Sequence, residues 1–275
     1  MTDTTYEHLL YEVDDEKICW LTLNRPECLN AFNAKLVSEL CHGLERAEHD
    51  EAVNAIVIRG SGRGFSSGHD LKEDAGDDFK TIYDYRNAYN DQQHEFMAAW
   101  RVSKPVIASV HYCAIGKGFE LALFCDITIV TSDTRLGYNE MRYGIAGMSM
   151  VMPWLVDMKT AKDLMLTGRE VTAAEARTMG LVTEVVQPGE LEAATLKKAR
   201  LVARMPSAMQ RAHKLYLNRI YELQGIRSAT DWYQDMQSML TFNAVPEYEE
   251  FQKTTNAKGL KPALAEAQKR YEGLD

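Results

Sequence analysis

The stretch PVIASVHYCAIGKGFELALFCDITIVT, residues 105–131, decides the fold expected for this chain. It begins with the mainly apolar run Pro105–Val110 and ends with a second one, Ile127–Thr131, and both are predicted to be buried strands. Between them, two glycines are followed by good helix formers, which predicts a tight turn and then a short helix. Strands separated by helices are typical of an α/β architecture with crossover connections.

The alternation of strands and helices extends toward the N-terminus, and the pattern becomes mostly helical after about residue 160. The N-terminal part contains two further expected strands and two expected helices, which are Ile18–Leu23, Ala55–Arg59, Ala34–Glu48 and Asp84–Arg101. After residue 131 we expect a strand over Leu181–Val186 and helices over Met148–Val156, Thr160–Leu166, Thr172–Met179, Glu190–Arg204, Ser207–Tyr221 and Ala229–Leu240.

Composition limits the class of protein. The 275 residues are 45% hydrophobic and 26% charged, as in globular chains long enough for a sizeable core. A net charge of −9 repels phosphate backbones, so no nucleic-acid interface is expected. Five cysteines without CxxC spacing argue against a disulfide framework and a cysteine metal site. The N-terminus has no signal-peptide pattern and no apolar run reaches the roughly 18 residues of a membrane span, so we expect a cytoplasmic protein without membrane attachment.

The helix expected after the glycine turn has features of a ligand site at its start. Gly116 and Gly118 allow the backbone to approach a ligand closely. The first N–H groups of a helix have no acceptor within it and favour negative charge nearby. Glu120 lies in the first turn, where a glutamate more often only compensates the helix dipole. From this segment alone, a functional role for Glu120 is the less common interpretation.

Two other segments have comparable features. FSSGHDLK, residues 65–72, follows a predicted strand, and its small residues and Gly68 permit a close backbone approach. An ordinary loop with Asp70 as a helix cap fits this segment as well. LGYNEMRYGIAG, residues 136–147, carries Glu140, with a predicted strand between it and Glu120. Taken alone, Glu140 fits a surface loop equally well.

Together with three more stretches, these segments resemble the enoyl-CoA hydratase/isomerase (crotonase) family over most of the chain. The similar stretches, in the family's order, are NRPECLNA (24–31), FSSGHDLKE (65–73), GKGFELA (116–122) with Cys125-Asp126, LGYNE (136–140), LTG (166–168) and AAEARTMGLV (173–182). The resemblance implies an α/β fold, with a crotonase-like spiral of ββα turns over residues 1–200 that carries the CoA-binding and active-site loops. It further implies a helical C-terminal trimerisation region over residues 201–275, and a homotrimer or homohexamer.

The resemblance also assigns roles to individual residues. The family's oxyanion hole is formed by two backbone N–H groups, which correspond to those of His69 and Lys117, and it stabilises the enolate of an acyl-CoA thioester. The family's acid and base around a water correspond to Glu120 and Glu140. No metal and no separate cofactor are expected, since coenzyme A is part of the substrate. The other residues expected at the substrate or CoA site are Arg25, Ser67, Gly68, Asp70, Leu71, Gly116, Tyr89, Gly147 and Met148.

The sequence differs from the family pattern mainly near the expected acyl pocket. Lys117 stands in the glycine run, Asn139 replaces the proline before the second glutamate, and Met148 falls where a family glycine helps to hold the water. The aromatic residues around Tyr89 fit simple packing at least as well as an acyl-site wall. Lys258 and Lys261 fit either a solvated face or contacts with the CoA phosphates of a neighbouring subunit.

Three classes of function follow from this pattern. Hydration of a 2-enoyl-CoA is favoured because both glutamates are present. Double-bond isomerisation, C–C bond hydrolysis and retro-aldol cleavage of an acyl-CoA use the same oxyanion hole and stay open. An RNA-binding or scaffold protein on the same fold is the third class, and the net charge of −9 and the glutamate pair argue against it.

Overall fold

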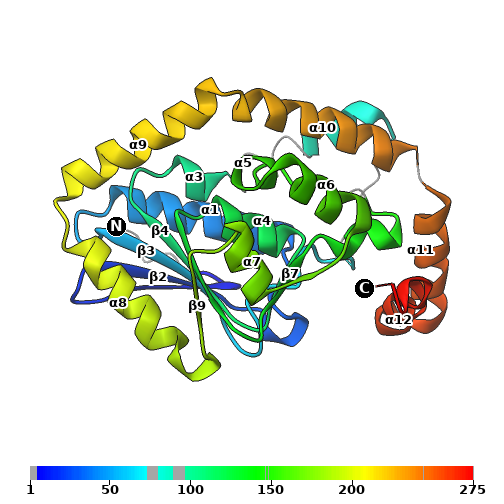
Figure 1. The fold of residues 1–275 in the computed structure, drawn as a ribbon, viewed down its shortest axis with the longest axis horizontal. Coiled ribbons are helices and arrows are strands. Elements are labelled where there is room, and N and C mark those ends of the chain that lie inside the picture. The colour runs from blue at the N-terminus through cyan, green and yellow to red at the C-terminus, as the bar shows by residue number, and fades with distance from the viewer. Residues whose placement is uncertain are drawn as a thin grey trace.

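The computed structural model describes residues 5–72, 80–88, 97–145, 147, 149–243 and 245–274. Within these ranges, a six-stranded sheet with the order β1-β2-β3-β4-β6-β9 forms the centre of the molecule (Figure 1). β1 is antiparallel to β2, and the other neighbouring strands are parallel. The strands are β1 (Leu9–Val13), β2 (Ile18–Leu23), β3 (Ala55–Gly60), β4 (Val106–Val110), β6 (Ile127–Thr131) and β9 (Glu184–Val186).

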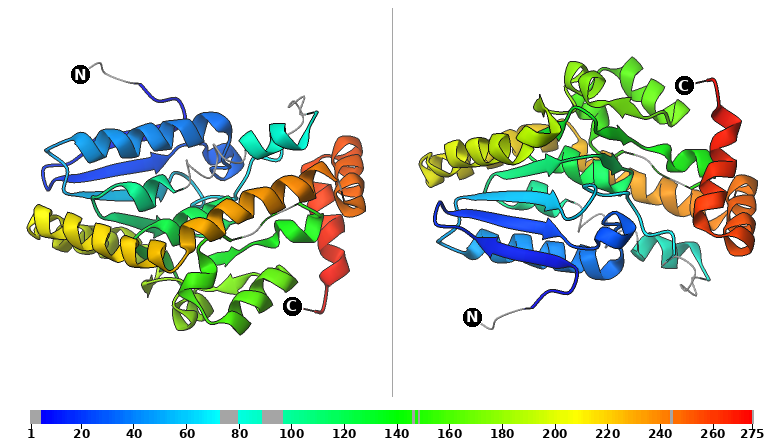
Figure 2. Two further views of the ribbon diagram at one scale, coloured as in Figure 1. Left: turned by 90° about the horizontal axis from the view of Figure 1, so that it is seen from above. Right: turned by 90° about the horizontal axis from the view of Figure 1, so that it is seen from below.

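Alternate residues of the strands face two different helical layers. Along β3, Ile56 and Ile58 belong to the core that contains α1 (Ala34–His49), whereas Ala55 and Val57 pack with α8 (Leu191–Ala203). Figure 2 shows α1 and α8 on opposite sides of the sheet. Because both faces are covered there, β2, β3, β4 and β6 are mainly apolar runs rather than alternating ones, which made them visible in the sequence, whereas the partly exposed β1 was not predicted.

A second, three-stranded sheet positions the candidate site. Its order is β5-β7-β8, with β5 (Cys113–Ile115), β7 (Arg135–Gly137) and β8 (Val171–Thr172). β5 and β7 are parallel, and β5 leads into helix α4 (Lys117–Phe124) whereas β7 leads into the 3₁₀ helix η3 (Asn139–Tyr143). Parallel neighbours end at the same edge of a sheet. The starts of α4 and η3 therefore lie side by side.

The C-terminal helices extend along one side of the molecule and then fold back (Figure 1). Tyr143 of η3, Phe251 and Ala263 form a small apolar cluster that joins the last two long helices to the second sheet region. The remaining helices are α3 (Ala98–Arg101), α5 (Met152–Leu155), α6 (Met158–Thr167), α7 (Ala173–Met179), α9 (Ser207–Leu223), α10 (Ile226–Phe242), α11 (Pro246–Lys258) and α12 (Leu260–Gln268). Shorter 3₁₀ turns are η1 (Pro26–Cys28), η4 (Pro188–Glu190) and η5 (Lys269–Tyr271), and residues 82–88 are also helical.

The α/β fold with a helical C-terminal region is confirmed. The strands expected over Ile18–Leu23 and Ile127–Thr131 have those bounds. The helix expected over Met148–Val156 is wrong at its start, because α5 begins only at Met152, whose N–H donates to the Ser149 hydroxyl oxygen. Met148 lies outside the described residues, as do residues 89–96 of the helix expected over Asp84–Arg101. The division at residue 200 falls inside α8 and stays a prediction.

No helix among the described residues is both long and apolar enough to cross a membrane.

Candidate active site

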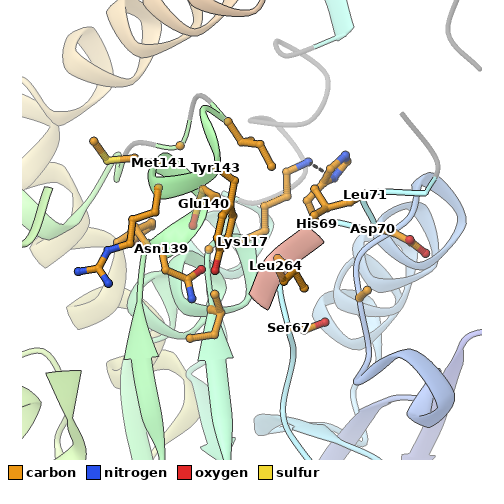
Figure 3. A pocket seen from close by; sticks show the side chains of 18 of the residues that line it. Ser67, His69, Asp70, Leu71, Lys117, Asn139, Glu140, Met141, Tyr143 and Leu264 are labelled. Atoms are coloured by element: carbon orange, nitrogen blue, oxygen red, sulfur yellow. Dashed lines mark hydrogen bonds between the residues drawn. The ribbon is translucent and has the colours of Figure 1, made fainter. Parts of the chain in front are cut away.

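A cavity of about 1830 Å³ lies at the edge where the second sheet ends (Figure 3). Its walls are the loop 67–72, the start of α4, η3 and parts of α10, α11 and α12. Small-molecule sites usually occupy roughly 300–1,000 Å³, so this cavity has room for a larger, elongated ligand.

The loop after β3 is held close to β5 and ends at His69. Ser66 bridges Ala114 in parallel fashion, and the Ile115 N–H donates to the Ser66 carbonyl at 3.1 Å. Gly68 has a φ of +94°, and a Cβ there would lie 2.7 Å from the Ile115 carbonyl oxygen, so only glycine fits. On its other side the loop pairs with Phe32, whose N–H donates to the Gly68 carbonyl at 2.7 Å. This parallel bridge turns the His69 N–H away from Phe32.

The start of α4 brings a second backbone N–H beside this loop. Lys117 is the first residue of α4, so its N–H has no acceptor within the helix. Gly116, before it, takes φ +50° and ψ −119°, and its N–H donates to the Gly137 carbonyl of β7 at 2.8 Å. A Cβ on Gly118 would lie 2.7 Å from Ser66 Cβ, so the glycine lets the helix approach the loop. His69 and Lys117 both line the cavity.

Glu120 is buried one turn into α4 and is held by several donors. Its side chain is 4% exposed and lines the cavity. Oε2 accepts hydrogen bonds from the Tyr138 hydroxyl and from Ser149 Oγ (2.8 Å), and Oε1 accepts one from the Met150 N–H at 2.8 Å. Burial raises the pKa of Glu120, and these donors oppose that rise because they stabilise the carboxylate. The donors therefore limit the effect of burial on the Glu120 carboxylate but do not reverse it.

Glu140 of η3 is the second buried carboxyl group of the cavity. Burial, and then the nearby charge of Glu120, raise the pKa of Glu140 to about 7. Its Oε2 is buried and has no hydrogen-bond partner among the described residues. A Cβ on Gly116 would lie 2.9 Å from Glu140 Oε1, and a Cβ on Gly147 would lie 2.3 Å from Glu140 Cγ. The carboxyl group therefore fits between two glycines and is available as a proton donor near neutral pH.

Tyr138 and Ser149, the two hydroxyl donors to Glu120, were not predicted from the sequence. Tyr138 follows β7 directly and is 3% exposed, and its ring packs against Phe119 with centroids 5.3 Å apart. Burial and the neighbouring Glu120 raise the pKa of Tyr138 well above its usual value, so the phenol stays a donor. A tyrosine two residues before a candidate acid was a usable signal, but nothing in the sequence placed Ser149 beside it.

Replacing Tyr138 by Phe is expected to raise the pKa of Glu120, because the carboxylate loses one of its donors while it stays buried. A hydrogen bond to a charged group contributes about 1.5–3 kcal/mol, so turnover at neutral pH should fall about 10- to 100-fold. The pH profile of kcat/KM should show its acidic limb moved to higher pH. Phe119→Leu removes the ring contact but no donor, so it should leave that limb in place. An unmoved limb in Tyr138→Phe would contradict stabilisation of the Glu120 carboxylate by the Tyr138 hydroxyl.

The structure places the other predicted residues as follows. Arg25 forms an ion pair with Asp70 at 2.9 Å, and Ser67 Oγ donates to the Cys28 carbonyl at 3.1 Å, so these side chains fasten the loop as well as line the cavity. Leu71 packs on the cluster of Tyr143, Phe251 and Ala263. Gly68, Gly116 and Gly147 line the cavity too. Tyr89 and Met148 lie outside the described residues.

The C-terminal helices cover the cavity of their own chain. Tyr248 of α11 and Leu260, Lys261 and Leu264 of α12 line it, and Figure 3 shows Leu264 in front of Lys117. From the sequence, Lys261 was expected only at the surface or in contact with a neighbouring subunit, because one-dimensional patterns do not show that the chain folds back.

No cluster of three or more His, Cys, Asp or Glu side chains among the described residues could hold a metal ion.

Comparisons with known proteins place this geometry in a family. A family model described as enoyl-CoA hydratase/isomerase matches residues 14–257. The chain belongs to this family. It is therefore an enzyme of the hydratase/isomerase type, and the family implies an acyl-CoA substrate.

Relatives support the assignment over most of the chain. A probable enoyl-CoA hydratase of Rhizobium meliloti (strain 1021) is 38% identical over 228 residues, which cover 80% of this chain and 84% of the relative. The 2,3-dehydroadipyl-CoA hydratase of Escherichia coli (strain K12) is 34% identical over 203 residues, which cover 72% of this chain and 77% of the relative. The crystal structure of an enoyl-CoA hydratase/isomerase from Xanthobacter autotrophicus Py2 superposes with a TM-score of 0.93 at 32% identity, covering 98% of this chain and 100% of that one.

Proposed function

We propose that this enzyme of the hydratase/isomerase family adds water across the double bond of a 2-enoyl-CoA thioester. The observation that carries the proposal is the pair of carboxyl groups in one cavity with different environments. Glu120 accepts three hydrogen bonds, whereas Glu140 has a pKa raised to about 7 and an Oε2 without a partner among the described residues. Donors that stabilise the carboxylate of Glu120 suit it to act as the base, and a buried carboxyl with an oxygen that lacks a donor suits Glu140 to act as the acid.

The proposed steps use four groups of the chain. The backbone N–H groups of His69 and Lys117 bind the thioester carbonyl oxygen and stabilise the enolate. Glu120 takes a proton from a water, and the water oxygen forms a bond to C3 while the C2–C3 π electrons move into the enolate. Glu140 then gives its proton to C2 as the carbonyl re-forms, which yields a 3-hydroxyacyl-CoA. No step needs a metal or a redox cofactor.

A double-bond isomerase is the second candidate, and one observation favours it. Both oxygens of Glu120 accept hydrogen bonds, whereas Glu140 has a buried oxygen without a partner among the described residues. A single mobile carboxyl group can remove a proton from one carbon and return it to another, so Glu140 alone could move a double bond.

Incubation of a short 2-enoyl-CoA with the enzyme in H₂¹⁸O tests the function. We expect a 3-hydroxyacyl-CoA that carries one ¹⁸O at C3, detected by mass spectrometry. A shifted double bond without ¹⁸O, with a 3-enoyl-CoA as a better substrate, would replace hydration by isomerisation. If no thioester reacts and the protein retains RNA on a filter at moderate salt, the catalytic proposal is wrong.

The homotrimer or homohexamer expected from the resemblance, the absence of a separate cofactor and the cytoplasmic location stay proposals. Large apolar side chains on the outer helices, including Leu223 of α9 (73% exposed) and Trp232 of α10 (67% exposed), support association of several chains. Light scattering in solution gives the mass that decides this point.

A further inference from the structure

The two segments that carry the proposed oxyanion N–H groups are joined at their base by backbone contacts. We call residues 66–69 the first arm and residues 115–117 the second arm. At the base, the Ser66 N–H donates to the Cys113 carbonyl and the Ile115 N–H donates to the Ser66 carbonyl, each at 3.1 Å. Beyond this pair, Gly68 has a φ of +94° and Gly116 a φ of +50°, so both arms turn at a glycine before they reach His69 and Lys117. The glycine turns therefore carry the two tips beyond the paired base of the arms.

A side-chain contact joins the tips of the arms. Lys117 Nζ lies 2.8 Å from His69 Nδ1, and Figure 3 marks this hydrogen bond with a dashed line. A protonated lysine is only a donor, so Nδ1 is the acceptor in this contact. The contact therefore joins the side chains of the same two residues whose backbone N–H groups are proposed to bind the carbonyl oxygen.

The position of the Lys117 ammonium group distinguishes its contact with His69 from a contact with the CoA phosphates. The positive charge of Lys117 lowers the pKa of Glu140, so the group lies within electrostatic reach of the reacting carboxyls. The basic side chains Arg63 and Lys261 line the same cavity, so a phosphate-bearing ligand has cations other than Lys117 to contact. Lys117 instead spans the interior of the cavity from α4 to the first arm.

We propose that the Lys117–His69 side-chain pair is a cross-link that fixes the separation and direction of the two oxyanion N–H groups, so that both side chains are positioning residues. The proposal rests on the proposed oxyanion role of the two backbone amides. Two donors stabilise an enolate only when both point at one oxygen, and a misplacement of about 1 Å can cost on the order of 100-fold in rate.

The test is a double-mutant cycle with two readouts. Lys117→Met keeps the length of the side chain and removes the amine, and His69→Leu removes the acceptor. Each is expected to lower kcat about 10- to 100-fold and to change the Kd of a saturated acyl-CoA less than about threefold. Infrared difference spectra should show the carbonyl stretch of the bound thioester returned toward its frequency in water. The double variant should lose less than the product of the two single losses, because both changes break the contact between the two side chains.

Two further variants separate positioning from other effects. His69→Asn keeps an acceptor near the position of Nδ1 and should restore most of kcat. Lys159→Met removes an equal charge from an exposed position on α6 and should behave as the unmodified enzyme. Additive losses in the double variant, a Lys117→Met effect confined to KM, or an unchanged carbonyl frequency would each overturn the cross-link.

Failure of the proposed function has a different signature. An enzyme that isomerises rather than hydrates would still show the carbonyl shift and the coupled losses, so the cross-link would stand while hydration would not. An unmodified protein that binds a saturated acyl-CoA without any carbonyl shift would overturn both.

Discussion

Replacing Glu120 or Glu140 by Gln is expected to lower hydration turnover by about 10²–10⁴-fold in each case, because glutamine keeps the shape of the side chain but cannot transfer a proton. Binding of a saturated acyl-CoA should change little, since the backbone amides and the CoA contacts remain. Stopped-flow or steady-state turnover, together with a separate binding measurement, gives both quantities. Glu39→Gln is the matched control, because Glu39 is also buried (6% exposed) but lies outside the cavity.

The pH dependence distinguishes the two glutamates. A general acid works only while it is protonated, and burial together with the Glu120 charge raises the pKa of Glu140 to about 7. The kcat/KM of the unmodified enzyme for hydration should therefore fall as the pH rises above about 7. Glu140→Gln should lack this limb in its residual activity. Glu120→Gln should keep a limb, because it still has Glu140 as the proton donor, but the limb should lie at lower pH, because the Glu120 charge no longer raises the pKa of Glu140.

The double variant, with Gln in place of both Glu120 and Glu140, distinguishes hydration from isomerisation and from a function without these glutamates. For two groups acting on one water, the loss in the double variant should be smaller than the product of the single losses. If only one single variant is inactive and the other is near normal, a single carboxyl performs the reaction and isomerisation replaces hydration. If neither change affects turnover or ligand affinity, the glutamates have no part in the function.

Four strands of the main sheet, β2, β3, β4 and β6, could be predicted because they are largely buried on both faces, whereas β1, which is partly exposed, was not predicted. Ile127–Thr131 is an apolar run with β-branched residues, and a helix cannot be fitted between its flanking turns. β5 and β7 have only three residues each, below the length at which a pattern emerges, and yet their parallel pairing is what brings Glu120 and Glu140 into one cavity. The pairing depends on contacts across the fold, which no local pattern contains.

Only those residues of the candidate site that lie in family-like motifs could be predicted. Family-like spacing indicated the backbone positions His69 and Lys117 and the two glutamates, and the structure brings all four to one cavity. The same motifs said nothing of the Tyr138 and Ser149 hydroxyls on Glu120, since Ser149 lies 29 residues from Glu120 along the chain. They also gave no account of the side chain of Lys117, whose partner lies 48 residues away.

Replacing Gly116 by Ala is expected to lower turnover by about 100-fold or more, for two reasons that act together. Gly116 has φ +50° and ψ −119°, a conformation that residues with a Cβ rarely adopt and that costs about 1–3 kcal/mol to impose on them. The chain would relieve this strain by rotating the peptide that carries the Lys117 N–H, which would turn that donor away from the carbonyl oxygen. The new Cβ would also lie 2.9 Å from Glu140 Oε1 and 3.1 Å from Oε2, so the proposed proton donor would have to move.

Gly180→Ala provides the control for strain alone. Gly180 has a φ of +84° at the end of α7, has no neighbour closer than 3.7 Å to a new Cβ, and does not line the cavity. We expect both variants to unfold at lower denaturant concentration, since both impose a positive φ on alanine. Only Gly116→Ala should also lose turnover and the infrared shift of the bound thioester carbonyl. Equal activity of the two variants would mean that the start of α4 neither aims a donor at the thioester nor seats Glu140, because the strain is common to both and only Gly116 adjoins these groups.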